Sequence, residues 1–128
     1  MHRTHSASFR ALNALFGHAG IEWNINEADA NEKETLKAYV AFYKRHRDLL
    51  HSGTVVRSDE IVGSAHLYGT VALDKKEAIF TYMQLTSNDD FGPLIATFDG
   101  LDKEITYQLT VVEELSADDF IQKQPPAW

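Results

Sequence analysis

The spacing of the apolar residues changes at Gly53 of this 128-residue chain, directly after its longest periodic stretch. Before Gly53, over 32–51, apolar side chains recur every three or four positions, which is the period of a helix with one apolar face. After Gly53 they alternate every second position, as in strands with one buried face, and short polar turns separate the runs. The pattern therefore predicts an α+β chain with helices first and antiparallel strands afterwards.

Two helices are predicted before Gly53. Residues 6–16 carry an apolar stripe, and Ser6 is the expected N-cap because its hydroxyl oxygen can accept a hydrogen bond from a free backbone N–H. Residues 32–51 form the longer helix, in which Asn31 and Glu34 approximate a capping box. Each helix is therefore expected to bury one face against another element.

A strand is predicted between the two helices. Over 20–26, the apolar Ile21, Trp23 and Ile25 alternate with polar residues, and period two over a short run indicates a strand. A parallel strand needs partners on both edges, and no other parallel strand is predicted. Either this strand joins the later sheet of a small α+β domain, or it belongs to a (β/α)8 barrel whose other strands are missing. A whole barrel needs roughly 250 residues, so this chain cannot contain one.

Five strands are predicted after Gly53. Tight turns are expected at 74–76, which begins with an aspartate, and at 99–102, where aspartate and glycine favour a reversal of the chain. A helical turn is expected over 116–121. The predicted strands are 54–57, 66–73, 77–86, 94–98 and 104–113.

The charge balance argues against two classes of partner. With 12 basic and 19 acidic residues, the net charge is −7. Nucleic acids and anionic membranes both need a basic surface, so neither is an expected partner. The chain has no cysteine, which excludes disulfides and thiolate chemistry and favours a cytoplasmic location. No apolar run is long enough to cross a membrane, and the first residues lack the apolar core of a signal peptide.

Three groups of residues stand at the spacing of known motifs. The first follows G-R-x-T-P-L-x-T-R-x-x-V-A-x-F-G-x-x-G-x-E, with Ser6 in place of proline; the second follows H-R-x-L-x-x-x-G and the third P-L…x-G-L-D. The matching residues are Arg3, Arg10, Phe16, Gly17, Gly20 and Glu22, then His46, Arg47, Leu49 and Gly53, then Pro93, Leu94, Gly100, Leu101 and Asp102. In this order, the chain resembles the C-terminal part of a bacterial α-galactosidase of glycoside hydrolase family 36, the melibiase-like enzymes.

The resemblance implies an architecture of two parts. Residues 1–53 would be the last αβα part of the catalytic barrel, with 20–26 as its eighth strand. Residues 54–128 would be an antiparallel C-terminal β-sandwich with an incomplete final segment, which packs against the barrel and does no chemistry.

The resemblance also implies a reaction. These enzymes hydrolyse terminal α-galactosides with retention, using two aspartates whose carboxyl groups lie roughly 5 Å apart. In the family both aspartates lie on earlier barrel strands. The sequence motifs that contain these aspartates do not occur in this chain. The chain is therefore expected to be structural and inactive alone, with galactosides as substrates of the full-length enzyme and with no cofactor. No metal site is expected either, because a zinc site needs three or four ligands in closed geometry and His2, His5 and His18 do not provide them.

Glu22 and Trp23 are the candidate substrate-binding residues. Both lie on the predicted eighth strand, and barrel active sites lie at the C-terminal ends of the strands. The structural alternative places Trp23 in the core and pairs Glu22 with a base such as Arg10.

Two other functions remain open. The β half could be a stand-alone carbohydrate-binding or interaction module, which would need an exposed aromatic row formed by Tyr68, Tyr82 and Tyr107. Alternatively, the chain could form an enzyme together with a separately encoded barrel. If the chain is a fragment, the apolar surface of 6–51 lacks its partner, and a homo-oligomer is expected.

Overall fold

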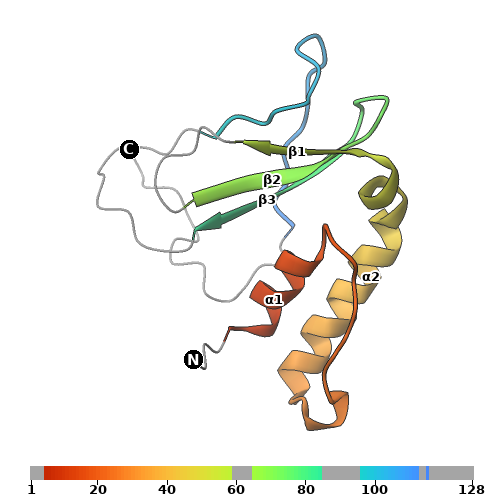
Figure 1. Cartoon of the computed structure of the whole chain (residues 1–128), viewed down its shortest axis with the longest axis vertical. Coiled ribbons are helices and arrows are strands. Elements are labelled where there is room, and N and C mark those ends of the chain that lie inside the picture. Colours follow the sequence, from red (N-terminus) through yellow and green to blue (C-terminus); the bar gives the residue numbers. More distant parts are fainter. Residues whose placement is uncertain (1–4, 59–64, 85–95, 113–114, 116–128) are drawn as a thin grey trace, which may run out of the picture. The chain divides into compact units, whose positions relative to one another are not determined.

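A computed structural model describes residues 5–58, 65–84, 96–112 and 115. The chain divides into two compact units, residues 1–45 with 109–128 and residues 46–108. The described elements are two α-helices, one short 3-10 helix and a three-stranded antiparallel sheet (Figure 1). The predicted α+β class is confirmed at this level, while the expected division at 53/54 stays a prediction.

Helix α1 spans Ala7–Ala14, so it ends two residues before the predicted end. Ser6 is its N-cap, as predicted, and the Ser6 hydroxyl oxygen accepts a hydrogen bond from the backbone N–H of Phe9 at 3.3 Å. Leu15, directly after the helix, is one of the most buried residues of the first unit. The cap therefore fixes where the helix starts, and Leu15 anchors its end.

The strand predicted over 20–26 is wrong. Residues 18–24 have no regular structure, and Ile25–Glu27 form the 3-10 helix η1. The side chain of Asn24 caps this turn by accepting from the N–H of Asn26 at 3.2 Å. A strand is stable only when a neighbour completes its ladder of hydrogen bonds, and no described segment does so here. The polar side chains therefore form local bonds instead.

Helix α2 spans Ala30–Ser52 and matches the predicted long helix. Its capping box lies two residues earlier than predicted. Asp29 Oδ1 accepts from the N–H of Glu32 at 2.8 Å, and Glu32 Oε2 accepts from the N–H of Asp29 at 3.1 Å. Carboxylates at this end also face the positive pole of the helix dipole. The helix ends at Gly53, whose N–H donates to the carbonyl of Leu49 at 2.9 Å.

The second unit contains the sheet, in the order β1-β2-β3 (Figure 1). Its strands are β1 (Thr54–Ser58), β2 (Ala65–Val71) and β3 (Ala78–Gln84), close to three of the predicted strands. The predicted turn at 74–76 joins β2 to β3, and Lys75 there has a φ of 58°. Leu67 and Val71 are 2% exposed, so the buried face of β2 forms the core of this unit.

The later predicted strands differ from the structure. Residues 96–98 and 104–112 form no strand, while 94–95, 113 and the helical turn over 116–121 lie outside the described residues. Tyr107 helps to hold the 104–112 segment in place. Its hydroxyl donates to the carbonyl of Lys75 at 2.7 Å and accepts from the N–H of Asp102 at 3.0 Å. The expected turn at 99–102 is present, and Gly100 has a φ of 84°.

Candidate functional site

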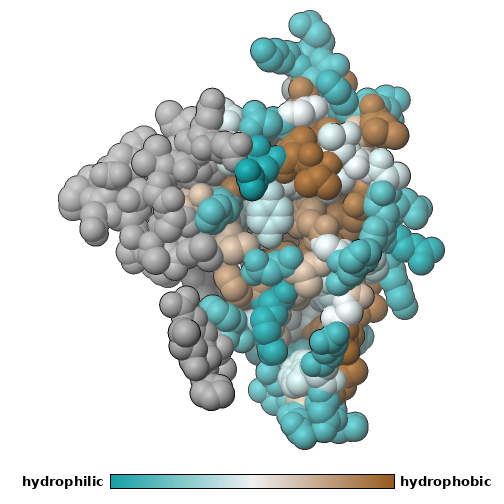
Figure 2. Space-filling view, in the orientation of Figure 1, coloured by the Kyte–Doolittle hydropathy of each residue, from teal (hydrophilic) through white to brown (hydrophobic). Residues whose placement is uncertain are grey.

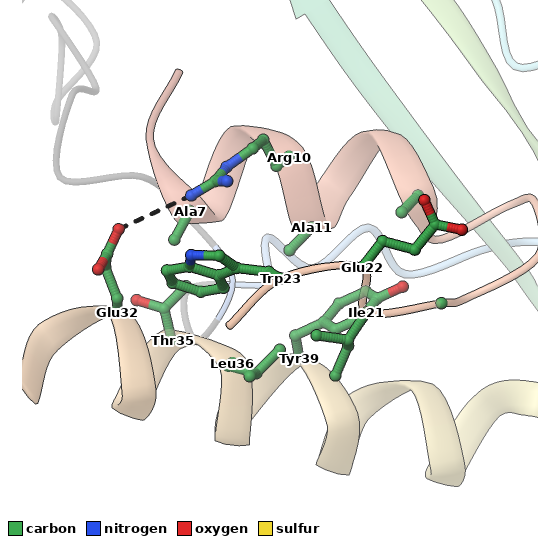
Figure 3. A pocket seen from close by; sticks show the side chains of 12 residues that line it. Ala7, Arg10, Ala11, Ile21, Glu22, Trp23, Glu32, Thr35, Leu36 and Tyr39 are labelled. Atoms are coloured by element: carbon green, nitrogen blue, oxygen red, sulfur yellow. Dashed lines mark ion pairs between the residues drawn. The ribbon is translucent and has the colours of Figure 1, made fainter. Parts of the chain in front are cut away.

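A hollow of about 250 Å³ lies in the first unit, between α1, the segment after it and α2 (Figure 3). Its α1 wall is made of three alanines and Arg10. It brings together both residues that the sequence singled out, Glu22 and Trp23. The lining residues are Ala7, Arg10, Ala11, Ala14, Gly20, Ile21, Glu22, Trp23, Glu32, Thr35, Leu36 and Tyr39.

Trp23 is half-buried, and the guanidinium of Arg10 lies over its indole ring. The guanidinium carbon of Arg10 lies 5.1 Å from the centre of the indole ring, within the range of a cation–π contact. The same guanidinium pairs with Glu32, with 3.7 Å between Arg10 Nη2 and Glu32 Oε1 (Figure 3). Because both partners of the ion pair are partly exposed, its contribution to stability is small. The arrangement fixes the indole between α1 and α2 and covers one of its faces.

Glu22 is exposed, and its carboxylate points away from the Trp23 indole (Figure 3). The predicted alternative, an ion pair between Glu22 and Arg10, is wrong, because Arg10 pairs with Glu32 instead. Within the described residues, Glu22 and Glu32 are the only carboxylates that line the hollow. Whether Glu22 and Trp23 contact a substrate stays a prediction.

Tyr39 closes the inner side of the hollow. The residue is 5% exposed, and its hydroxyl is buried without a hydrogen-bond partner among the described residues. Burial raises the pKa of this hydroxyl above its ordinary value of 10.0, and the nearby Tyr43 raises it further. The two ring centres lie 6.4 Å apart. A buried hydroxyl without a partner is costly, so Tyr39 is the polar group of the hollow with unmet bonding capacity.

A groove of about 470 Å³ lies along α2 and is also lined by the segment after α1. Its floor is apolar, with Ile21 and Ile25 from that segment and Leu36 and Val40 from α2. Ile21 and Leu36 also line the first hollow, so the 20–25 segment is open on two flanks. The remaining residues of the groove are Lys33, Lys37, Ala41 and Lys44.

The tyrosines predicted to form an aromatic row do not form one. In the register of the sheet, Tyr82 stands opposite Leu67, so Tyr68, one residue further along β2, faces the other side. Tyr107 lies outside the strands and is engaged with backbone groups through its hydroxyl. The sheet therefore does not present these rings as one platform.

The sequence predicts neither a metal site nor a membrane span. In residues 5–58, 65–84, 96–112 and 115, no three His, Cys, Asp or Glu side chains are grouped as ligands. The ring of His5 stacks on Phe9 at 4.8 Å, and His2 lies outside the described residues. No described helix is both long and apolar enough to cross a membrane.

Ten of the twelve residues that line the hollow were not predicted from the sequence as site residues, among them Glu32, Thr35 and Tyr39. Thr35 and Tyr39 lie four residues apart on one face of α2, and this spacing is the only sequence signal that links them. Glu32 and Arg10 are 22 positions apart in the chain. No local pattern can pair two charges at that separation.

Known proteins match this chain in sequence and in fold. Residues 1–53 match the family model described as melibiase. An α-galactosidase of Escherichia coli is 36% identical over 131 residues, covering 98% of this chain and 18% of that enzyme. The α-galactosidase AgaA of Geobacillus stearothermophilus is 29% identical over 108 residues, covering 84% and 15% respectively. The crystal structure of the α-galactosidase from Lactobacillus brevis has a TM-score of 0.69 and 33% identity, covering 78% of this chain and 14% of that one.

These matches place the chain among relatives of the glycoside hydrolases. More narrowly, it is a relative of the melibiase-type α-galactosidases, which confirms the resemblance seen in the sequence motifs. The chain spans less than a fifth of the length of the relatives that it matches.

Proposed function

We propose that this chain is the C-terminal part of a longer α-galactosidase, where it completes the fold and supplies no catalytic carboxylate. The observation that carries the proposal is the coverage: 98% of the chain aligns with 18% of the E. coli enzyme. In the full-length protein, the substrates would be terminal α-galactosides and the reaction a retaining hydrolysis. The chain alone would have no activity.

In this proposal, residues 1–53 are the last αβα part of a barrel. The 20–26 segment carries the alternating pattern of a strand but has no ladder partner in the described residues, and hollows lie on two of its flanks. A strand that has lost its neighbouring strands would keep its alternating sequence, lack ladder partners and have open space on its flanks. Glu22 and Trp23 would then be near the active-site end of the eighth strand. Residues 54–128 would form the β-sandwich, of which the β1-β2-β3 sheet is the described part.

A chimera tests the proposal directly. The segment of the E. coli α-galactosidase that aligns with this chain is replaced by the 128 residues, and hydrolysis of a chromogenic α-galactoside is measured. We expect the chimera to hydrolyse the substrate, while the E. coli enzyme without the segment does not. A chimera that folds cooperatively and is inactive would contradict the proposal.

The isolated chain provides the second half of the test. We expect no hydrolysis of the same substrate by the purified 128 residues. Turnover that persists after repeated purification, and that disappears in Glu22→Gln, would mean that the chemistry lies in this chain after all.

A further inference from the structure

The groove along α2 combines an apolar floor with a basic rim. On α2 its lining residues recur at three- and four-residue spacing from Lys33 to Lys44, so they form one continuous stripe of the helix. Ile21 and Ile25 remain 45% and 44% exposed, although their neighbours on α2 are partly buried. Large aliphatic side chains left this open are more often covered by a partner surface than by water.

All the charged residues that line the groove are positive. Three of the seven lysines in the chain line this groove, and no described aspartate or glutamate lines it. Lys37 has a neighbour in Glu34 at 3.4 Å, but both side chains are about three-quarters exposed and this pair contributes little. In a chain whose net charge is −7, this is a local reversal of sign.

The surface coloured by hydropathy shows apolar side chains next to polar ones (Figure 2). In Figure 2, hydrophobic and hydrophilic side chains adjoin over the lower part of the view, where Figure 1 places α2 and the segment after α1. A partner that buries the apolar floor must bring groups that match the lysine rim, since unmatched charges at the edge of an interface reduce specificity.

A second copy of the chain fits this groove poorly. If the stripes of two α2 helices packed antiparallel, the Lys33 end of one would meet the Lys44 end of the other. Like charges would then face each other at both ends of the contact, which is unfavourable. An occupant with carboxylates beside its apolar face has no such conflict.

We propose that the groove formed by Ile21, Ile25, Leu36, Val40 and the three lysines docks an amphipathic segment of the remaining part of the longer enzyme, with acidic residues that face Lys33, Lys37 and Lys44. This inference rests on the proposed function and specifies the chemistry of the contact. Apolar burial supplies the affinity, and the charges set position and choice of partner.

Two dyes of similar shape test the groove in the 128-residue chain. 8-Anilinonaphthalene-1-sulfonate is apolar and anionic, and N-phenyl-1-naphthylamine is its neutral counterpart. We expect the triple variant Lys33→Glu, Lys37→Glu, Lys44→Glu to weaken binding of the anionic dye by roughly tenfold, with little change for the neutral dye. Ile25→Ser, which alters only the floor, should weaken binding of both dyes.

A matched control separates the groove from a general charge effect. Lys103→Glu changes the charge by the same amount per residue at an exposed turn of the other unit. It should leave the affinity for both dyes unchanged. Equal loss of the anionic dye in the triple variant and in Lys103→Glu, after correction for the number of charges, would overturn the proposal.

The chimera with the E. coli enzyme then tests the docking in a complete protein. We expect the triple lysine variant to lower its Tm relative to Lys103→Glu, and we expect high salt to reduce that difference. An active chimera with an unchanged Tm in the triple variant would overturn the docking proposal and leave the proposed function standing. An inactive, folded chimera would contradict the proposed function, and the dye measurements would still decide whether the groove selects an anionic apolar ligand.

Discussion

Two glycines of the second unit stand where a side chain has no room. A Cβ on Gly53 would meet Thr70 Cγ2 and would lie 2.7 Å from the Val71 carbonyl. A Cβ on Gly69 would meet the Ile79 carbonyl and would lie 2.7 Å from Phe80 Cδ1. These glycines allow the end of α2 and the partner strand to approach β2 closely.

We therefore expect Gly53→Ala and Gly69→Ala each to lower the free energy of unfolding, by about 1–3 kcal/mol, because overpacking forces the backbone to shift. Urea denaturation monitored by circular dichroism measures the change. Gly20→Ala is the matched control, since nothing lies within 4 Å of the position of its Cβ. If all three variants unfold at the same urea concentration, the close approach is not a constraint.

A substitution at Tyr39 is expected to raise the free energy of unfolding rather than lower it. Its buried hydroxyl has no partner in the described residues, so Tyr39→Phe removes a desolvated polar group. The free energy of unfolding should rise by about 1 kcal/mol. A fall of that size in thermal or urea denaturation would mean that the hydroxyl is hydrogen-bonded in solution.

The raised pKa of Tyr39 also sets a pH dependence. In the folded state the hydroxyl keeps its proton at a pH where the unfolded chain releases it, so this contribution to stability is complete below about pH 10. It is lost as the pH rises toward the folded pKa. Tyr39→Phe should flatten the alkaline decline in the free energy of unfolding. Tyr68, whose pKa is also raised by burial, should account for part of the decline that remains.

At the scale of elements, the start of α2 depends on Asp29 and Glu32. Their reciprocal hydrogen bonds satisfy two backbone N–H groups that the helix leaves free. Asp29→Ala should lower the free energy of unfolding by about 1 kcal/mol. Asn31→Ala, at the position that the sequence favoured as the cap, should change it by less than half as much. A larger effect at Asn31, measured by thermal denaturation, would restore the predicted capping box.

The elements that the sequence predicted correctly have signals close together in the chain. The 32–51 periodicity, the Ser6 cap and the turn at 74–76 each depend on neighbours within a few residues. The strands predicted over 20–26 and 104–112 are absent because alternation alone does not provide a partner strand. The three correct strands follow one another in the chain and pair in that order, so each has a partner close in sequence. Asp29 was missed as the cap for a smaller reason: Asn31 with Glu34 offered a similar spacing.

The candidate site also contains residues that the sequence identifies and a pairing that it does not. Trp23 and Glu22 were found because the family motif and the barrel rule both point to that segment. Arg10 was named only as a partner for Glu22, and in the structure it forms an ion pair with Glu32 instead. The choice between the two carboxylates is made by where α1 lies relative to the start of α2, which the sequence does not encode locally.

For the whole molecule, the open flanks of the 20–25 segment have a consequence for association. The isolated chain exposes Ile21 and Ile25, so we expect it to self-associate weakly as its concentration rises, in line with the expected homo-oligomer. The contact would be a packing other than the antiparallel pairing of two α2 helices, which the lysines of the groove oppose. Light scattering after gel filtration measures the mass. In the proposed docking the rest of the enzyme would cover these residues, so the chimera should not show the concentration dependence. A monomer at all concentrations would show that the exposed residues do not drive association.

Helix α2 belongs to both compact units, since the first ends at Arg45 and the second begins at His46. The last two turns of the helix, with the buried Leu49 and Leu50, are thus counted with the strands rather than with the helix start. A genetic crossover between two related α-galactosidases at codon 53 would join a helix end from one parent to a sheet from the other. A crossover near codon 45 would instead inherit the whole second unit, with the helix end and the sheet, from a single parent.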